Sequence, residues 1–115
     1  MEDWIKRVEL SDSVENIGTA FRHSGIEEIK LGDGIKSLDE NAFYGCKNLK
    51  KIEFGNNMQT IGEAAFQKCI SLDEVVFSDS IEIIEKSAFL ECSNLKKVHL
   101  PNNLKTIGDS AFMYC

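Results

Sequence analysis

Four cysteines are the residues of this chain whose side chains could most readily do chemistry. Each ends the signature Ala-Phe-x-x-Cys, and each lies 23 residues after the last: Cys46, Cys69, Cys92 and Cys115. A thiolate can ligate a metal or attack an electrophile, and two thiols can form a disulfide. A metal site needs ligands that converge on one point, whereas this spacing, without paired Cys or His, places the thiols in a row.

Disulfides are the second alternative for these cysteines. In a stack of repeats, neighbouring Cys Cα atoms would lie about 5 Å apart, within disulfide range, but their side chains would point the same way. We therefore predict buried free thiols that pack as small apolar side chains. Disulfides and a metal remain the alternatives.

Other combinations of reactive residues give little support for catalysis. His23 and His99 occupy different repeat positions, and neither has a nucleophile or carboxylate at a suggestive spacing. No Gly-rich phosphate loop occurs. We expect a non-enzymatic protein with no cofactor and no metal.

A column of oxygen-bearing side chains recurs once per repeat: Asp12, Asp33, Asn56, Asp79 and Asn102. Such a column could bind calcium, as in some β-solenoids. Asp and Asn in turns usually bond their own backbone, and two of the five are neutral amides, so turn formation is the favoured interpretation.

Composition excludes some partners. The net charge of −6 and the absence of a basic run argue against nucleic-acid binding. The apolar stretches are too short for a membrane span, and the acidic N-terminus has no apolar core, so we expect no span and no signal peptide in this sequence. No linker divides it, which predicts a single domain over residues 1–115.

The 23-residue period divides the chain into copies. We place them at 5–25, 26–48, 49–71, 72–94 and 95–115, the first shortened, with Ser24 in the cysteine position, and the last truncated. Terminal copies are expected to be atypical because they lack one neighbour. Trp4 is placed to cover the first copy, or is an ordinary surface tryptophan.

Two apolar patterns recur inside each copy. The first, as in Leu49, Ile52 and Phe54, alternates and predicts a short strand with one buried face. After a polar turn comes a pair three residues apart, as in Met58 and Ile61, which fits either a second extended segment or a helical turn.

The Ala-Phe-x-x-Cys signature itself favours a helical turn. Phe66 and Cys69 are three residues apart, so they would share one face of a helix. Thr60 with Glu63 resembles a capping box just before it. Glu85 occupies a position that is Gly in three other copies and Asp in one, and because a positive φ would strain Glu, we predict an ordinary φ there.

A single copy cannot be stable alone. About six buried side chains, at roughly 1.5–3 kcal/mol each, do not offset the ordering of a whole copy at roughly 1–2 kcal/mol per residue. Stacked in register, the copies would form a parallel sheet over a continuous core. The predicted core ladder consists of Phe21, Phe43, Phe66, Phe89, Phe112, Cys46, Cys69, Cys92 and Cys115.

The repeat resembles the BspA-like leucine-rich repeat family. Residues 95–101, Leu104, Ile107-Gly108, Ala111-Phe112 and Cys115 follow the pattern L-x-x-I-x-L-P-x-x-L-x-x-I-G-x-x-A-F-x-x-C. The resemblance implies an α/β-type, right-handed leucine-rich repeat solenoid, with a parallel sheet on the concave side and short helical, 3-10 or irregular segments on the convex side. It also implies a surface or secreted protein that adheres to host, matrix or other cells; a cytoplasmic location is not excluded by the sequence.

Recognition would then fall to the strand residues that face away from the core. They form two columns, one alternating in sign: Arg7, Glu28, Lys51, Glu74, Lys97, and Glu9, Lys30, Glu53, Val76, His99. Neighbouring charges can pair across strands, so the face is either a protein-binding site or a self-neutralised, solvated surface. A third column, Arg22, Tyr44, Gln67, Leu90 and Met113, is apolar in three places and is either a contact surface or a set of isolated exposed residues.

The expected function is a scaffold for protein–protein interaction, with the identity of the protein ligand left open. The alternative is a structural spacer, or a fragment of a larger protein, with no binding role. The sequence stops at Cys115, before the fifth copy is complete, which predicts an uncapped C-terminal end available for self-association.

Overall fold

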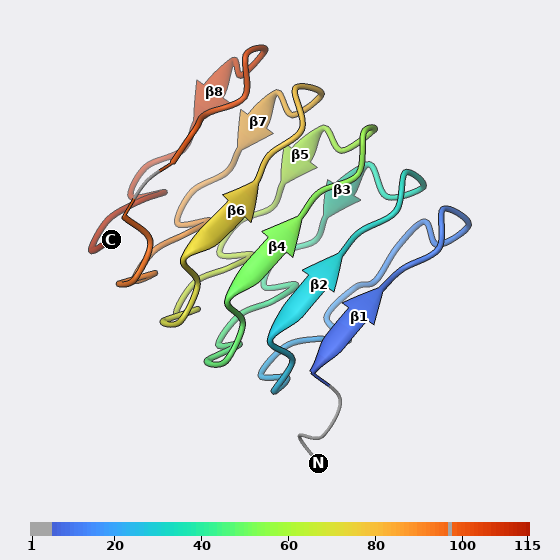
Figure 1. The fold of residues 1–115 in the computed structure, drawn as a ribbon. Helices are drawn as coiled ribbons and strands as arrows, with labels where there is room; N and C mark the ends of the chain where they lie inside the picture. Colours follow the sequence, from blue (N-terminus) through green and yellow to red (C-terminus); the bar gives the residue numbers. More distant parts are fainter. Residues whose placement is uncertain (1–5, 97) are drawn as a thin grey trace.

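The chain folds as a right-handed coil with two facing parallel sheets (Figure 1). A computed structural model describes residues 6–96 and 98–115; Trp4 and Lys97 lie outside the described residues. The first sheet contains β1 (Arg7–Glu9), β2 (Glu28–Lys30), β4 (Lys51–Glu53) and β6 (Glu74–Val76). The second contains β3 (Ser37–Leu38), β5 (Thr60–Ile61), β7 (Ile83–Ile84) and β8 (Thr106–Ile107). This is the predicted leucine-rich repeat solenoid, with a second sheet in place of helices.

The strands pair in the register that the repeat dictates. Ile29 pairs with Ile52, and Ile52 with Val75, each one period further along the chain. Val8 pairs with Ile29 although the first copy is shorter, so the missing residues are absorbed outside the strand. Since side chains alternate across a strand, this register puts every central strand residue into the same core.

The second apolar pair of each copy is extended. Leu38, Ile61 and Ile84 are buried in β3, β5 and β7, which settles the choice between a strand and a helical turn. Thr60, which resembled a helix cap, is a strand residue that pairs with Ser37. The capping-box interpretation is therefore wrong.

The helical interpretation of Ala-Phe-x-x-Cys is also wrong, because no helix occurs in residues 6–96 and 98–115. The signature forms successive β-turns, as where Tyr44 N donates to Asn41 O at 3.1 Å and Cys46 N to Phe43 O at 3.2 Å. Asn41 and Gly45 have φ values of 64° and 70°, which a right-handed helix does not allow.

Backbone N–H groups of these turns donate hydrogen bonds to carbonyl groups of the next repeat, whereas in a helix the acceptors would lie in the same segment. Phe43 N donates to Ala65 O, Phe66 N to Ala88 O and Phe89 N to Ala111 O, each at 2.7 Å. These bonds satisfy backbone groups that would otherwise be buried without partners. Glu85 does not have a positive φ, as predicted; the left-handed residues in its copy are Ser87, at 60°, and Glu91, at 63°.

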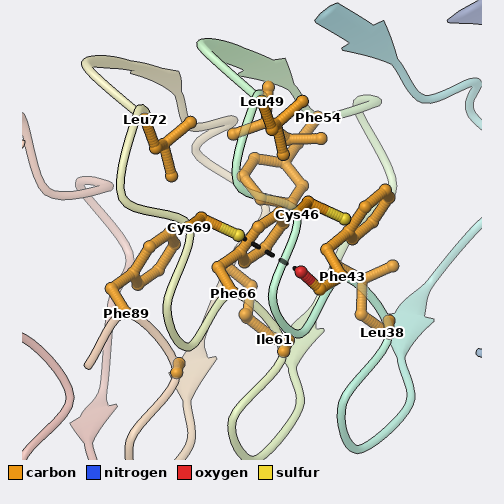
Figure 2. Close-up of a cluster of buried hydrophobic side chains, with 14 of the residues drawn as sticks. Leu38, Phe43, Cys46, Leu49, Phe54, Ile61, Phe66, Cys69, Leu72 and Phe89 are labelled. Carbon is orange, nitrogen blue, oxygen red and sulfur yellow. Dashed lines mark hydrogen bonds between the residues drawn. The ribbon is translucent and has the colours of Figure 1, made fainter. Parts of the chain in front are cut away.

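The core lies between the two sheets and the turns (Figure 2). Phe43, Phe66 and Phe89 are fully buried, and their rings stack nearly parallel with centroids 5.0 Å apart at both steps. Phe21 and Phe112 extend the stack at its two ends, with centroid distances of 5.5 Å to Phe43 and 5.2 Å to Phe89. Both end residues are only half-buried, because each has a neighbour on one side.

The stack predicts a position-dependent cost of removing one ring. Phe66→Ala should lower the free energy of unfolding by about 3–5 kcal/mol, because it opens a cavity between two rings in the middle of the core. Phe112→Ala removes the same side chain from the half-buried end and should cost clearly less. Urea denaturation of both variants measures this, and equal losses would show that stacking from both sides contributes nothing.

Candidate functional site

The strand face is the solvent side of the first sheet. Eight of the ten predicted binding residues lie on it in two register-matched columns: Arg7, Glu28, Lys51, Glu74, and Glu9, Lys30, Glu53, Val76. His99 is exposed but follows the last strand of this sheet, and Lys97 lies outside the described residues. The short strands therefore gather side chains about 23 residues apart in sequence onto one surface.

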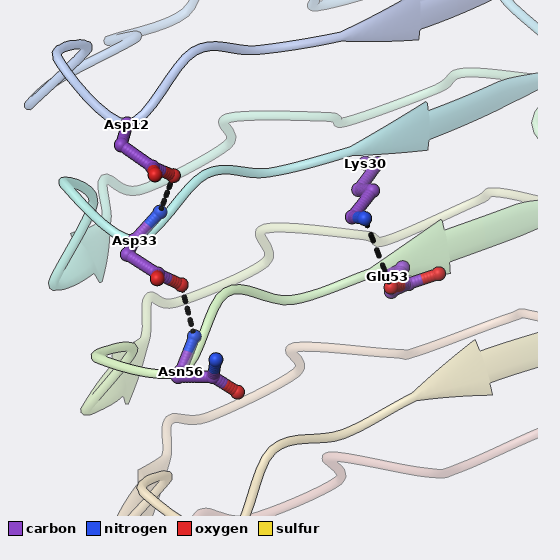
Figure 3. A network of polar contacts seen from close by, with 5 residues as sticks. All are labelled: Asp12, Lys30, Asp33, Glu53 and Asn56. Carbon is purple, nitrogen blue, oxygen red and sulfur yellow. Dashed lines mark hydrogen bonds and ion pairs between the residues drawn. The ribbon is translucent and has the colours of Figure 1, made fainter.

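Two of the expected cross-strand charge pairs are formed. Lys30 Nζ lies 3.8 Å from Glu53 Oε2 (Figure 3), and Lys51 Nζ lies 3.7 Å from Glu74 Oε1. These side chains are between 36% and 59% exposed, so water screens the pairs and each stabilises the fold by only about 0.2–1 kcal/mol. A partner can therefore pair with these charges while the fold loses little stability.

A groove runs along the carboxyl ends of β1, β2 and β4. Its volume is about 440 Å³, and its charged lining comes from two sources: Glu9, Lys30 and Glu53 on the strands, and Asp12 and Asp33 on the turns. Four carboxylates and one ammonium group make it acidic. A smaller hollow of about 60 Å³ adjoins it on the strand face, where Arg7, Glu28 and Lys51 contribute to the lining.

The Asp and Asn column fixes the turns that border this groove. Asp12 Oδ1 accepts a hydrogen bond from Asp33 N at 2.8 Å, and Asp33 Oδ1 accepts one from Asn56 N at 2.8 Å (Figure 3). Asp79 Oδ1 does the same for Asn102 N at 3.1 Å. The expectation that these side chains bond their own turn is thus corrected, because each carboxylate here holds the turn of the next repeat.

The sequence indicates a turn role for this Asp and Asn column, but it gives no sign that Asp12, Asp33 and Asn56 line a groove. Within the described ranges, no three His, Cys, Asp or Glu side chains are grouped closely enough to hold a metal ion. The hydrogen bonds between repeats give these carboxylates a structural role.

The cysteines line a buried column beside the phenylalanine stack. Cys46, Cys69 and Cys92 are buried free thiols, as predicted, whereas Cys115 is an exposed free thiol, so the prediction of a buried thiol is wrong at that position. Each donates to the carbonyl of the phenylalanine one repeat earlier, as Cys69 Sγ does to Phe43 O at 3.2 Å (Figure 2). The other three bonds measure 2.9, 3.1 and 3.2 Å. The thiols of the middle copies are thereby placed inside the fold, where a substrate cannot reach them.

The C-terminal end of the coil exposes apolar side chains that are buried in earlier copies. Ile107 is 46% exposed, whereas Ile61 and Ile84 at the same repeat position are fully buried. Leu100 is 46% exposed and Val98 is 37% exposed. Across the described residues there is no helix with the length and hydropathy that a membrane crossing requires.

Parallel strands stacked at a fixed step, with a phenylalanine and cysteine column behind them, define a leucine-rich repeat solenoid. The chain belongs to the BspA-type leucine-rich repeat family, since the family model "BspA type Leucine rich repeat region" matches six copies over residues 2–115. Proteins of this family and fold are typically scaffolds for protein interaction without enzymatic activity.

Solved structures agree with this assignment. A leucine-rich cell surface protein from Faecalibacterium prausnitzii aligns with a TM-score of 0.82 and 26% identity, over 95% of this chain and 33% of that one. The leucine-rich repeat protein of T. pallidum aligns with a TM-score of 0.78 and 33% identity, over 92% of this chain and 47% of that one.

A leucine-rich repeat protein from Bacteroides ovatus gives a TM-score of 0.75 and 27% identity, over 97% of this chain and 35% of that one. This chain therefore spans less than half the length of these three structures. Comparison with curated proteins produced no match.

Burial of the thiols predicts instability at alkaline pH. Burial, aided by the neighbouring Cys115, raises the pKa of Cys92 to about 12. Above the ordinary thiol pKa of about 8.5, the unfolded chain releases this proton while the folded chain keeps it. The stability contribution is therefore complete below that pH and is lost as the pH rises toward 12.

Urea denaturation between neutral pH and pH about 10 tests this prediction. Cys92→Ala should lower the free energy of unfolding at every pH, but that free energy should then fall less steeply as the pH rises. Cys115→Ala removes an exposed thiol and should flatten the decline less. An unchanged slope in Cys92→Ala would contradict the assignment.

Proposed function

We propose that this chain is a non-enzymatic scaffold that binds another protein through the strand face and the groove beside it, at a cell surface, in adhesion or in host or matrix binding. The observation that carries the proposal is the groove of about 440 Å³, whose charged rim is positioned by strands and turns in strict register. The class of partner follows from the family, whose domains generally bind proteins. The surface location is supported by the F. prausnitzii structure, which is that of a cell surface protein.

Energetics favour binding over a purely structural role for these charges. Exposed ion pairs contribute little to folding, so Lys30–Glu53 and Lys51–Glu74 are a weak reason for a charged surface. Charges held in fixed positions give a partner specificity and a faster association rate. The side chains can also vary without touching the core, because they point away from it. A spacer would make no use of this arrangement.

Charge reversal on the strand face tests the proposal. Lys30→Glu/Lys51→Glu should weaken binding to a protein partner at least tenfold, because it breaks both cross-strand ion pairs, places like charges side by side and removes two cations from the face. Surface plasmon resonance against a panel of purified cell-surface and matrix proteins provides the measurement.

The matched control is Lys36→Glu/Lys86→Glu, which changes the net charge equally at exposed positions flanking β3 and β7 of the second sheet. Capture that survives reversal on the strand face, or that both variants lose alike, would argue against this face. A chain that captures no panel protein would favour the spacer.

Self-association through the C-terminal end is a second candidate, favoured by the exposure of Ile107, Leu100 and Val98. Large exposed apolar patches commonly mark interaction sites. Burial of these side chains against a second copy would replace the neighbour that covers the same positions in earlier repeats.

Sedimentation velocity over a range of concentrations checks this candidate. We expect a reversible dimer whose dissociation constant rises at least tenfold in Ile107→Lys. Ile70→Lys serves as the control, because Ile70 is similarly exposed, at 45%, but belongs to the third copy and not to the C-terminal end. A monomer at all concentrations would refute the self-association.

A further inference from the structure

At the edge formed by the Ala-Phe-x-x-Cys turns of the first three copies, two cations lie against one tyrosine, and a third lines a hollow beside it. We name this cluster the basic edge; it consists of Arg22, His23, Tyr44, Lys47 and Lys68. It lies at the side where β2 and β4 begin, across the coil from the acidic turns (Figure 1). The strand face contains none of these residues.

Tyr44 organises the cluster. The Arg22 guanidinium carbon lies 5.4 Å from the centre of the Tyr44 ring, and Lys68 Nζ lies 5.9 Å from it. The imidazole of His23 meets the same ring edge-on, with centroids 5.5 Å apart. Because an aromatic face attracts cations, Tyr44 holds two positive charges from copies on either side of its own.

The backbone beneath the cluster is fixed. His23 N donates to Tyr44 O, and Lys68 N donates to Leu90 O, both at 2.9 Å. Gly45 has a φ of 70° and packs so closely under the His23 imidazole that a Cβ would collide with Nδ1. Glycine is therefore favoured at position 45 both by the positive φ and by the lack of space for a Cβ. The His23 imidazole packs directly against this turn.

A hollow of about 230 Å³ opens beside this contact. It is lined by His23, Ser24, Gly25, Gly45, Lys47 and Asn48. The lining combines an ammonium group with imidazole, hydroxyl and amide groups that can donate hydrogen bonds, and it contains no carboxylate. Such a hollow suits an anionic group.

Within residues 6–96 and 98–115, no ion pair neutralises the cations of the basic edge. The four ion pairs found among the described residues engage Lys6, Lys30, Lys51 and Lys105. Arg22, Lys47 and Lys68 are exposed and belong to none of them. In a chain of net charge −6, this edge is a local concentration of positive charge.

We propose that the basic edge binds an acidic peptide segment, with carboxylates of the segment held by Arg22, Lys47 and Lys68. Arginine grips a carboxylate through two parallel hydrogen bonds, and lysine adds a point charge. The three cations come from successive copies, which lie about 4.8 Å apart, so one small anion cannot satisfy them all. An extended segment with several carboxylates can follow them along the coil.

The surroundings favour a short acidic segment over a long polyanion. The residue that follows Lys68 in the same column of the next copy is Glu91. This carboxylate would repel a polyanion that continues along the coil beyond the three cations. A short peptide can place its carboxylates over the three cations and end there.

The test uses fluorescein-labelled hexaglutamate, with hexaglutamine as the uncharged probe, in anisotropy titrations at low ionic strength. The unmodified chain should bind hexaglutamate and not hexaglutamine. Arg22→Glu/Lys68→Glu should weaken that binding at least tenfold, whereas the matched control Lys36→Glu/Lys86→Glu should keep it. Equal weakening in both variants, or binding of hexaglutamine, would overturn the proposal.

Tyr44 variants separate positioning from net charge. Tyr44→Phe keeps the aromatic face and should preserve binding, while Tyr44→Ala should weaken it several-fold without any change in charge. Equal affinity in the two variants would contradict the positioning role of the ring.

Two competitors distinguish the sources of negative charge. Inorganic phosphate should displace hexaglutamate only weakly, and a sulfated polysaccharide should bind less tightly than hexaglutamate. Preference for either competitor, with the same loss in Arg22→Glu/Lys68→Glu, would overturn the acidic-peptide assignment. Lys30→Glu/Lys51→Glu on the strand face should leave hexaglutamate binding intact, so this proposal and the proposed function can fail separately.

Discussion

Backbone hydrogen bonding between consecutive repeats is the constraint on which the rest of the structure depends. Phe43, Phe66 and Phe89 donate their N–H groups to the following copy at 2.7 Å, and the strands pair at the same step. The strands and the turns share one register. Equivalent side chains of successive repeats are therefore aligned in columns by backbone hydrogen bonding alone. The phenylalanine stack, the thiol column and the charged strand face all follow from that alignment.

Much of the fold was predictable because it depends on patterns that a strand or a stack imposes directly. Alternation around Ile52 indicated which side chains would be buried, and the 23-residue step indicated which residues would be neighbours. The Ala-Phe-x-x-Cys turn was not predictable in the same way. Phe66 and Cys69, three apart, fit a helix face and successive turns equally well, and the deciding partner of Phe66 N is Ala88 O in another copy.

The surfaces were predictable to different degrees for a similar reason. The strand face follows from one repeat position read down the stack, so its columns could be named from the sequence. The groove combines strand residues such as Glu53 with turn residues such as Asp33, and the basic edge combines different repeat positions in Arg22, Lys47 and Lys68. A cluster assembled across positions leaves no periodic mark, so three-dimensional structure is needed to find it.

The first copy shows how such a coil can change in length. It is shorter than the three middle copies, yet Val8 still pairs in register with Ile29, because the missing residues fall around Phe21 in the turn. We therefore expect the coil to accept changes in length in two forms: whole turns added or removed along the stack, and single residues lost at its outer edge. Selection can lengthen the molecule or remodel its rim while the spacing of the charges on its sheet stays the same.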